Sequence, residues 1–162
     1  MHRVGQVVAH VRARVEPEEE ALVARILPPG GRRLFAAMPV ADRRHGLDVA
    51  EALLRDGHDD GDLLGAALLH DAAKGHRMRL WHRVSGVLLE AFGPRLLRRL
   101  ASDDPASWRH PFHLHLHHGP MSAELATAAG CSPRLGAFVR GEAATDADAR
   151  LLRALHDADD AS

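Results

Sequence analysis

A histidine and an aspartate, His70 and Asp71, stand side by side directly after the apolar run of residues 63–69. Burying a carboxylate costs several kcal/mol unless a cation or hydrogen-bond donors compensate it. A divalent metal ion is the simplest compensation, because imidazole nitrogen and carboxylate oxygen are both natural metal ligands. Lys74 follows three residues after Asp71, one helical turn further on, where its ammonium group can neutralise or orient the carboxylate.

Further ligands must come from other parts of the chain. His45 belongs to the expected helix of residues 42–54, and two antiparallel helices would present it beside His70 and Asp71. A fourth ligand would come from the acids that end the apolar segment 151–160. The chain has 13 histidines and one cysteine, without a Cys-His zinc pattern, so the chemistry to expect is that of imidazole and carboxylate.

The elements that carry these residues are expected to be helices, because Ala, Leu, Arg and Glu dominate and β-branched residues other than valine are sparse. Pro17 and the three glutamates after it form a good helix start, and Pro28-Pro29-Gly30-Gly31 is a helix breaker. Residues 62–74 are apolar nearly all round, which predicts a central, buried helix. The expected helices cover residues 17–27, 34–38, 42–54, 62–74, 80–92, a segment after Pro94, 120–129, 133–140 and 146–158.

The length of 162 residues fits about one domain. We therefore predict an all-α, single-domain helical bundle around the central buried helix, with residues 1–33 as a helical extension packed on the domain of residues 34–162. A net charge of −1 gives no field for nucleic acid or membrane surfaces, and no apolar run is long enough to span a bilayer. One cysteine and the lack of a signal-peptide pattern favour a cytoplasmic location. The oligomeric state stays open.

The pattern resembles the HD superfamily of metal-dependent phosphohydrolases. The signature of that family is a histidine, then a His-Asp doublet after an apolar helix, then a late aspartate. Here these are His45, His70-Asp71 and an aspartate in the segment 158–160. The resemblance runs from about residue 34 to the C-terminus, includes the stretch 66–74, and implies an HD-type helical domain.

Carried over by position, the resemblance implies His45, His70, Asp71 and Asp159 as ligands of a divalent metal. Asp159 is favoured because it follows alanine, as the family aspartate often does; Asp157 and Asp160 are the alternatives. The ligand set suits Mn, Fe, Co, Ni or Zn, and Mg is a further option.

The resemblance further implies hydrolysis of a phosphate ester, such as a nucleotide, by a metal-activated water. Asp71 would act as the base that aligns this water, and Lys74 would stabilise the phosphate or fix Asp71. Arg77 and Arg83 are candidates for binding phosphate, since guanidinium pairs with it bidentately.

A second histidine cluster occupies residues 110–120. It resembles the region where dinuclear family members place another metal-binding histidine, and His118 is the closest match, with His117 beside it. Gly141 stands where a further family histidine would be, while Glu142 offers an oxygen. His117, His118 and Glu142 are thus candidates for a second metal or for substrate. The alternation of histidines at residues 113, 115 and 117 predicts a short extended segment.

Three hypotheses follow. The first is a metal-dependent phosphohydrolase acting on a small phosphate ester or nucleotide. The alternative is a catalytically weak or inactive HD-type protein that binds a metal or phosphorylated ligand as a sensor or scaffold, because Gly141 replaces a ligand. The third is a helical interaction module without a metal.

Overall fold

The computed structural model describes residues 17–74, 93–104 and 106–162. Within these ranges the chain forms eight α-helices and no strand, which confirms the all-α class. They are α2 (Pro17–Ile26), α3 (Pro29–Ala37), α4 (Val40–Arg55), α5 (Gly61–Leu69), α7 (Pro94–Leu100), α8 (His110–Ala128), α9 (Pro133–Val139) and α10 (Asp146–Ala161). None of the helices in the described ranges has the length and apolar character needed to cross a bilayer.

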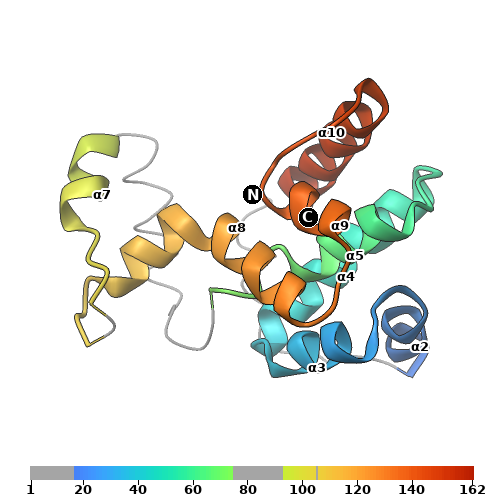
Figure 1. Ribbon diagram of the computed structural model, residues 1–162, viewed down its shortest axis with the longest axis horizontal. Helices are drawn as coiled ribbons and strands as arrows, with labels where there is room; N and C mark the ends of the chain where they lie inside the picture. Colours follow the sequence, from blue (N-terminus) through green and yellow to red (C-terminus); the bar gives the residue numbers. More distant parts are fainter. Residues whose placement is uncertain (1–16, 75–92, 105) are drawn as a thin grey trace, which may run out of the picture.

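Helix α5 lies at the centre of the bundle and contacts α2, α3, α4, α8, α9 and α10. All residues from Leu63 to Leu69 are buried, as expected for a helix that is apolar on every side. Figure 1 shows α2 and α3 on one side of α5 and α9 and α10 on the other, while α8 leads away from this body toward α7. The central helix therefore connects the elements that carry the candidate ligands.

The central helix ends at Leu69, earlier than the sequence predicts. Asp60 caps its start, because the carboxylate accepts hydrogen bonds from the backbone N–H groups of Asp62 and Leu63 at 3.0 and 3.1 Å. At the other end, residues 70–74 form turns in which Ala72 N–H donates to Leu69 O and Lys74 N–H to Asp71 O, both at 3.0 Å. Bonds of this three-residue type tighten the chain after a helix. The His-Asp doublet thus lies in a turn at the C-terminal end of α5.

The diglycine of residues 30–31, predicted as part of a helix breaker, lies inside α3. Pro28 precedes the helix and Pro29 begins it, so the break is confined to the prolines. The glycines allow close packing instead: a Cβ at residue 30 would lie 2.0 Å from Ala129 O, and one at residue 31 would lie 3.0 Å from Cys131 Sγ. The predicted division at residue 33 also falls inside α3, where the buried residues Gly31 and Phe35 lie on either side of it.

Residues 110–118 are helical, so the extended segment predicted from the alternating histidines is wrong. Pro111 occupies the first turn of α8, where its fixed φ favours a helix and its missing N–H costs no hydrogen bond. Helix α8 also continues through Pro120, which the sequence places at a helix start. The alternating histidines therefore do not mark a β-strand. Because the segment is a helix, imidazole rings contact one another at spacings of three and four residues.

Candidate metal centre

Three helices bring two histidines and one aspartate together. His45 lies on α4, His70 follows the last residue of α5, and Asp159 lies in the last turns of α10. His45 Nε2 lies 2.8 Å from Asp159 Oδ1, and His70 Nε2 lies 3.4 Å from the same oxygen. The two imidazole rings are 5.2 Å apart between centroids and meet edge to face. One donor atom from each residue lies within 4.8 Å of the others, so the group can hold a metal ion.

The close approach of α4 and α5 sets the position of His45. Gly46 faces the backbone of α5: a Cβ there would lie 3.0 Å from Ala67 O and 3.1 Å from Leu68 O. Helices pack this closely only where a small residue allows it. The glycine next to His45 therefore brings its imidazole within reach of His70.

The hydrogen bonding of His70 fixes which ring nitrogen faces the centre. Nδ1 lies 2.8 Å from Ala67 O, and because a carbonyl only accepts hydrogen bonds, Nδ1 carries the proton. In neutral His70 the lone pair of Nε2 then faces the centre. Histidines that bind metals show this arrangement, with the second nitrogen bonded to a carbonyl or carboxylate.

His70 Nε2 is buried, without a hydrogen bond of normal geometry, and faces the oxygens of Asp159 and Asp71 at 3.4 and 3.5 Å. A lone pair opposite two carboxylates is unfavourable unless a positive charge lies between them, either a proton or a metal ion. Burial lowers the pKa of His70, but the charges of Asp71 and Asp159 outweigh it, so the pKa is raised. The residues present therefore fit a cation.

Asp71 is the most deeply buried acid of the centre, with 2% of its side chain exposed. Lys74 Nζ lies 2.7 Å from its Oδ2 and 2.6 Å from its Oδ1. Burial raises the pKa of this carboxyl, but the nearby charges of His70 and Lys74 outweigh burial and lower the pKa to about 2. Asp71 is therefore ionised at neutral pH. It adjoins the group of His45, His70 and Asp159 through His70.

Asp159 is the terminal aspartate that reaches the two histidines. Burial raises the pKa of its carboxyl, but the hydrogen bond with His45 and the close contact with His70 outweigh burial and hold the pKa well below its usual range. Asp157 and Asp160, the sequence alternatives, are exposed on the same helix. The helical rotation between neighbouring residues turns them away from the position of Asp159.

The residues expected at a second metal separate in the structure. His118 approaches the centre, with Nε2 3.9 Å from Asp71 Oδ1. The ring of His117 lies 4.5 Å from that of His113, which is also on α8. Glu142 is exposed and its Oε2 pairs with Arg140 Nε at 2.9 Å. Of these candidates, His118 is the one placed beside Asp71.

Gly141, where the family resemblance expects a histidine, lies two residues after the end of α9. Its φ of +75° lies in the left-handed region that favours glycine. Its N–H donates to Phe138 O at 3.0 Å, and the N–H of Glu142 donates to Ala137 O at 2.9 Å. This is the hydrogen-bond pattern of a helix C-terminus. The glycine is therefore required by the backbone.

Several sequence predictions fall outside the described residues. The candidate phosphate-binding residues Arg77 and Arg83 belong to this part of the chain, as does the whole of the helix expected at residues 80–92. Residues 1–16 of the predicted N-terminal extension also lie outside.

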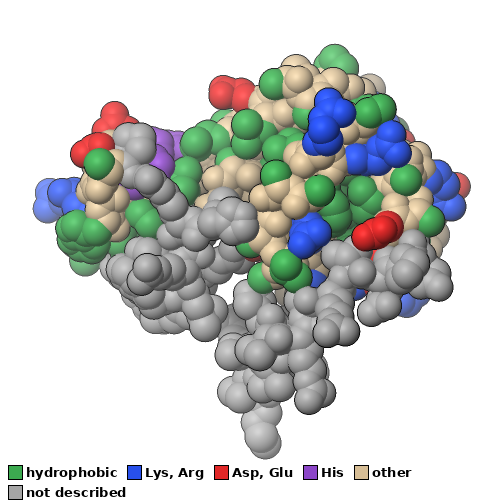
Figure 2. Space-filling view, turned by 90° about the horizontal axis from the view of Figure 1, so that it is seen from below, with side chains coloured by type: hydrophobic (Ala, Val, Ile, Leu, Met, Phe, Trp, Pro, Cys, Tyr) green, Lys and Arg blue, Asp and Glu red, His purple; other side chains and the backbone are tan. Residues whose placement is uncertain are grey.

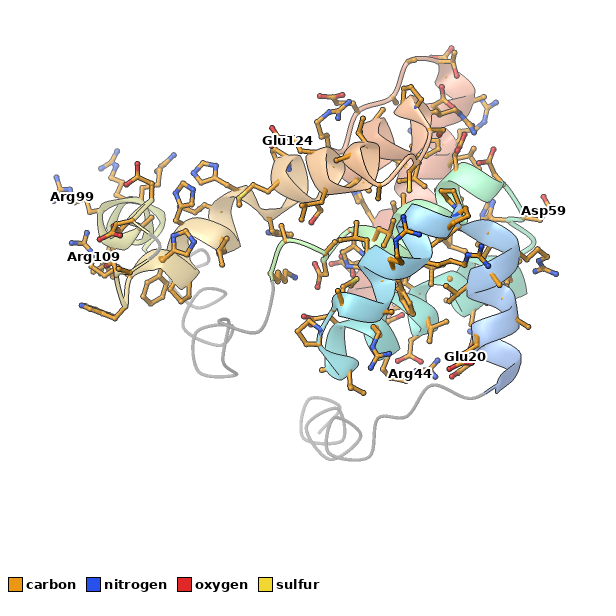
Figure 3. All side chains as sticks on the ribbon, turned by 60° about the horizontal axis from the view of Figure 1, so that its bottom comes forward. Glu20, Arg44, Asp59, Arg99, Arg109 and Glu124 are labelled. Carbon is orange, nitrogen blue, oxygen red and sulfur yellow. The ribbon has the colours of Figure 1, made fainter. Side chains whose placement is uncertain are left out.

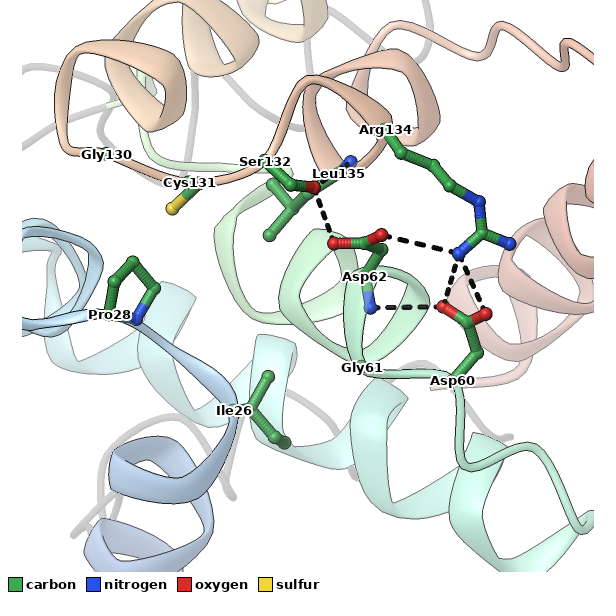
Figure 4. A pocket seen from close by; sticks show the side chains of 10 residues that line it. All are labelled: Ile26, Pro28, Asp60, Gly61, Asp62, Gly130, Cys131, Ser132, Arg134 and Leu135. Carbon is green, nitrogen blue, oxygen red and sulfur yellow. Dashed lines mark hydrogen bonds and ion pairs between the residues drawn. The ribbon is translucent and has the colours of Figure 1, made fainter.

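Sequence reasoning missed the role of Arg134 at the opposite end of α5. Its guanidinium contacts Asp60 at 2.8 Å, Asp62 at 3.3 Å and Asp148 at 2.8 Å. Arg134, Asp60 and Asp62 line a cleft of about 520 Å³ between the starts of α5 and α9 (Figure 4). The sequence places two acids, Asp60 and Asp62, at one helix start and Arg134 at another. Their spacing along the chain does not show that these two helix starts are neighbours.

Ser122 was also missed. It is fully buried on α8, and its Oγ accepts a hydrogen bond from the Ala73 N–H at 3.0 Å. This bond fixes the turn of residues 70–74, which carries the His-Asp doublet, against α8.

Comparison with known proteins finds no family model, no curated protein and no solved structure that matches this chain.

Proposed function

We propose that this protein is a metal-dependent phosphohydrolase of HD type that acts on a small phosphate ester or nucleotide. The observation that carries the proposal is the convergence of His45, His70 and Asp159 from three helices. The orientation of the His70 lone pair toward two carboxylates supports it. The sequence resemblance to the HD superfamily supports the reaction type.

A divalent metal at this centre would lower the pKa of a bound water and neutralise charge on a phosphate. His45, His70 and Asp159 would hold it, and imidazole with carboxylate suits Mn, Fe, Co, Ni or Zn. His70 is oriented for this role by the Ala67 carbonyl.

Asp71 is suited to accept a proton or orient a water molecule, because it is ionised and next to His70. Lys74 holds this carboxylate in place and adds a positive charge beside the centre, which favours an anionic substrate. His118 approaches the same carboxylate from α8. The turn of residues 70–74 thus brings a base and a cation to the edge of the metal group.

The neighbouring aspartates of α10 allow a matched test. Asp159→Asn removes one negative ligand oxygen, and we expect metal affinity to fall by more than about 10-fold, the loss that even an outer-shell partner typically causes. Hydrolysis of a panel of nucleotides and generic phosphate esters, measured as free phosphate with added Mn²⁺, should fall in parallel. The control Asp160→Asn changes an exposed residue and should leave both unchanged.

Equal metal loading of wild type and Asp159→Asn would refute the metal centre. Chelation adds an independent readout, since a metal at 100 times its Kd stabilises the folded state by about 2.7 kcal/mol. Unfolding that is insensitive to both chelator and Mn²⁺ would favour the helical interaction module.

A binding protein without turnover is the second candidate. It is favoured by the engagement of Glu142 with Arg140 and by the backbone role of Gly141, which leave the expected second-metal set incomplete. A metal-loaded protein that shows no turnover on the panel, but whose melting temperature rises with one of the phosphate compounds, would support this candidate.

A further inference from the structure

We propose that His110, His113 and His117 on α8 form a separate binding site for a divalent transition metal such as Zn²⁺, Ni²⁺ or Cu²⁺. The three residues are spaced by three and four positions, so the helix places them on one face. The rings of His110 and His113 stack with centroids 5.7 Å apart, and those of His113 and His117 are 4.5 Å apart. Imidazole selects these metals over Mg²⁺ and Ca²⁺, which prefer oxygen ligands.

The pair His113 and His117 supplies the core of the site. Two histidines four residues apart on a helix can share one metal ion, which is how a helical metalloprotease motif binds zinc. His113 is partly buried and His117 is exposed, so the pair is open to solvent at one side. A metal can reach it without a change in the fold.

The hydrogen bonding of His110 decides which of its ring nitrogens is available to a metal. Its Nδ1 lies 3.2 Å from Ser102 O, and because the carbonyl accepts, Nδ1 carries the proton and Nε2 bears the lone pair. This is the arrangement that fixes the ligating nitrogen in metal-bound histidines. The next residue, Asp103, acts on His113 through its negative charge and brings a carboxylate to the same region.

The loop that carries Ser102 and Asp103 is held against α8. The guanidinium of Arg109 donates hydrogen bonds to the carbonyl oxygens of Leu100 at 2.7 Å and Arg99 at 2.5 Å, at the end of α7. Figure 3 shows Arg99 and Arg109 together at this end of the molecule. The contact fixes the end of α7 relative to the start of α8, so the Ser102 carbonyl is in place to orient His110.

This site is separate from the His45, His70 and Asp159 centre and does not depend on the proposed function. His118 approaches Asp71, whereas its neighbour His117 lies against His113. Figure 2 shows histidine side chains gathered at the end of the molecule formed by α7 and the start of α8, with acidic side chains beside them. One helix therefore contributes imidazoles to two places.

The test uses the full chain carrying His45→Gln and Asp159→Asn, which remove ligands of the first centre and leave α8 unchanged. Zn²⁺ titrated into this protein by calorimetry should bind at one site. Adding His113→Gln or His117→Gln should weaken binding by more than about 10-fold, the loss that even an outer-shell partner typically causes. Adding His58→Gln instead, which removes a histidine from the turn between α4 and α5, should change the Zn²⁺ affinity less than threefold.

A second measurement reports the ligands directly. Electron paramagnetic resonance of bound Cu²⁺ in the same background should show coupling to the nitrogens of at least two imidazoles, and each α8 substitution should remove one. Circular dichroism verifies that the variants stay helical. The proposal is overturned if Zn²⁺ affinity is unchanged in His113→Gln and His117→Gln, or if the His58 control weakens binding equally. Neither result bears on the proposed metal centre of His45, His70 and Asp159, because that centre is tested by comparing wild type with Asp159→Asn.

Discussion

At the scale of single residues, Asp71 is the most deeply buried charge beside the first centre. This carboxylate is almost completely buried and is balanced by Lys74 and His70. Its pKa of about 2 follows from those two charges, which outweigh burial. A buried charge that loses its partner costs far more than an exposed one, so Lys74 should matter for stability as well as for activity.

Lys74→Met should lower the free energy of unfolding by about 1–3 kcal/mol, because it leaves the Asp71 carboxylate buried without its ammonium partner. Urea denaturation at neutral pH measures the change. Arg140→Met is the matched control, since the Arg140–Glu142 pair is exposed and such pairs contribute about 1 kcal/mol or less. Equal losses in the two variants would contradict the role assigned to Lys74.

At the scale of the elements, the contact between α4 and α5 decides whether His45 reaches His70. The contact is closest at Gly46, where the backbone of α5 leaves no room for a side chain. Two effects oppose each other at this position. Alanine favours a helix over glycine by about 1 kcal/mol, whereas overpacking against a rigid neighbour costs about 1–3 kcal/mol.

Gly46→Ala should therefore destabilise the protein by up to about 2 kcal/mol and weaken metal binding, because α4 must move away from α5 and carry His45 with it. Urea denaturation and metal titration check both effects. Gly61→Ala, at the start of α5, is the control: nothing lies within 4 Å of a Cβ there, so alanine should leave stability unchanged or raise it. A stable Gly46→Ala with normal metal affinity would show that the helices do not need this close approach.

For the whole molecule, Arg134 joins elements that are distant in sequence. It lies on α9 and pairs with Asp60 at the start of α5 and Asp148 in the first turn of α10. Burial raises the pKa of Asp60, but the hydrogen bonds from Arg134 and the backbone outweigh it and lower the pKa. Hydrogen bonds from Thr145 and Arg134 lower the pKa of Asp148. This network links the starts of three helices.

Because both carboxyls have a lower pKa in the folded state, their contribution to stability is complete above the unfolded pKa of about 4. It is lost as the pH falls through the folded pKa values. Arg134→Gln should therefore lower stability at pH 7 and make stability less dependent on pH below about 4. Thermal unfolding from pH 7 to pH 2 measures this. Arg150 is an exposed arginine on α10, and the control Arg150→Gln should keep the wild-type dependence of stability on pH. If Arg150→Gln weakens this dependence as much as Arg134→Gln does, the change in net charge is the cause and the Arg134 network is not.

The sequence by itself determined most of the local structure. The apolar residues 63–69 predict the central helix, and proline and acids predict the start of α2. These features depend on neighbours along the chain, which is why patterning captures them. The sequence also singled out His45, His70, Asp71 and Asp159, because their order resembles a known family. It misread residues 110–118, because a histidine alternation without apolar alternation does not define a strand.

Only the tertiary structure decided which side chains meet. Asp159 Oδ1 lies 2.8 Å from His45 Nε2 across 114 residues, and the sequence does not distinguish it from Asp157 or Asp160 by spacing alone. The rotation of α10 about its axis makes that choice, and packing of Leu152, Leu155 and Ala158 into the core sets the rotation. The direction of His117 toward His113, and of His118 toward Asp71, likewise depends on the phase of α8. Helix phase and packing distance arise from contacts between distant segments, so a linear sequence does not contain them explicitly.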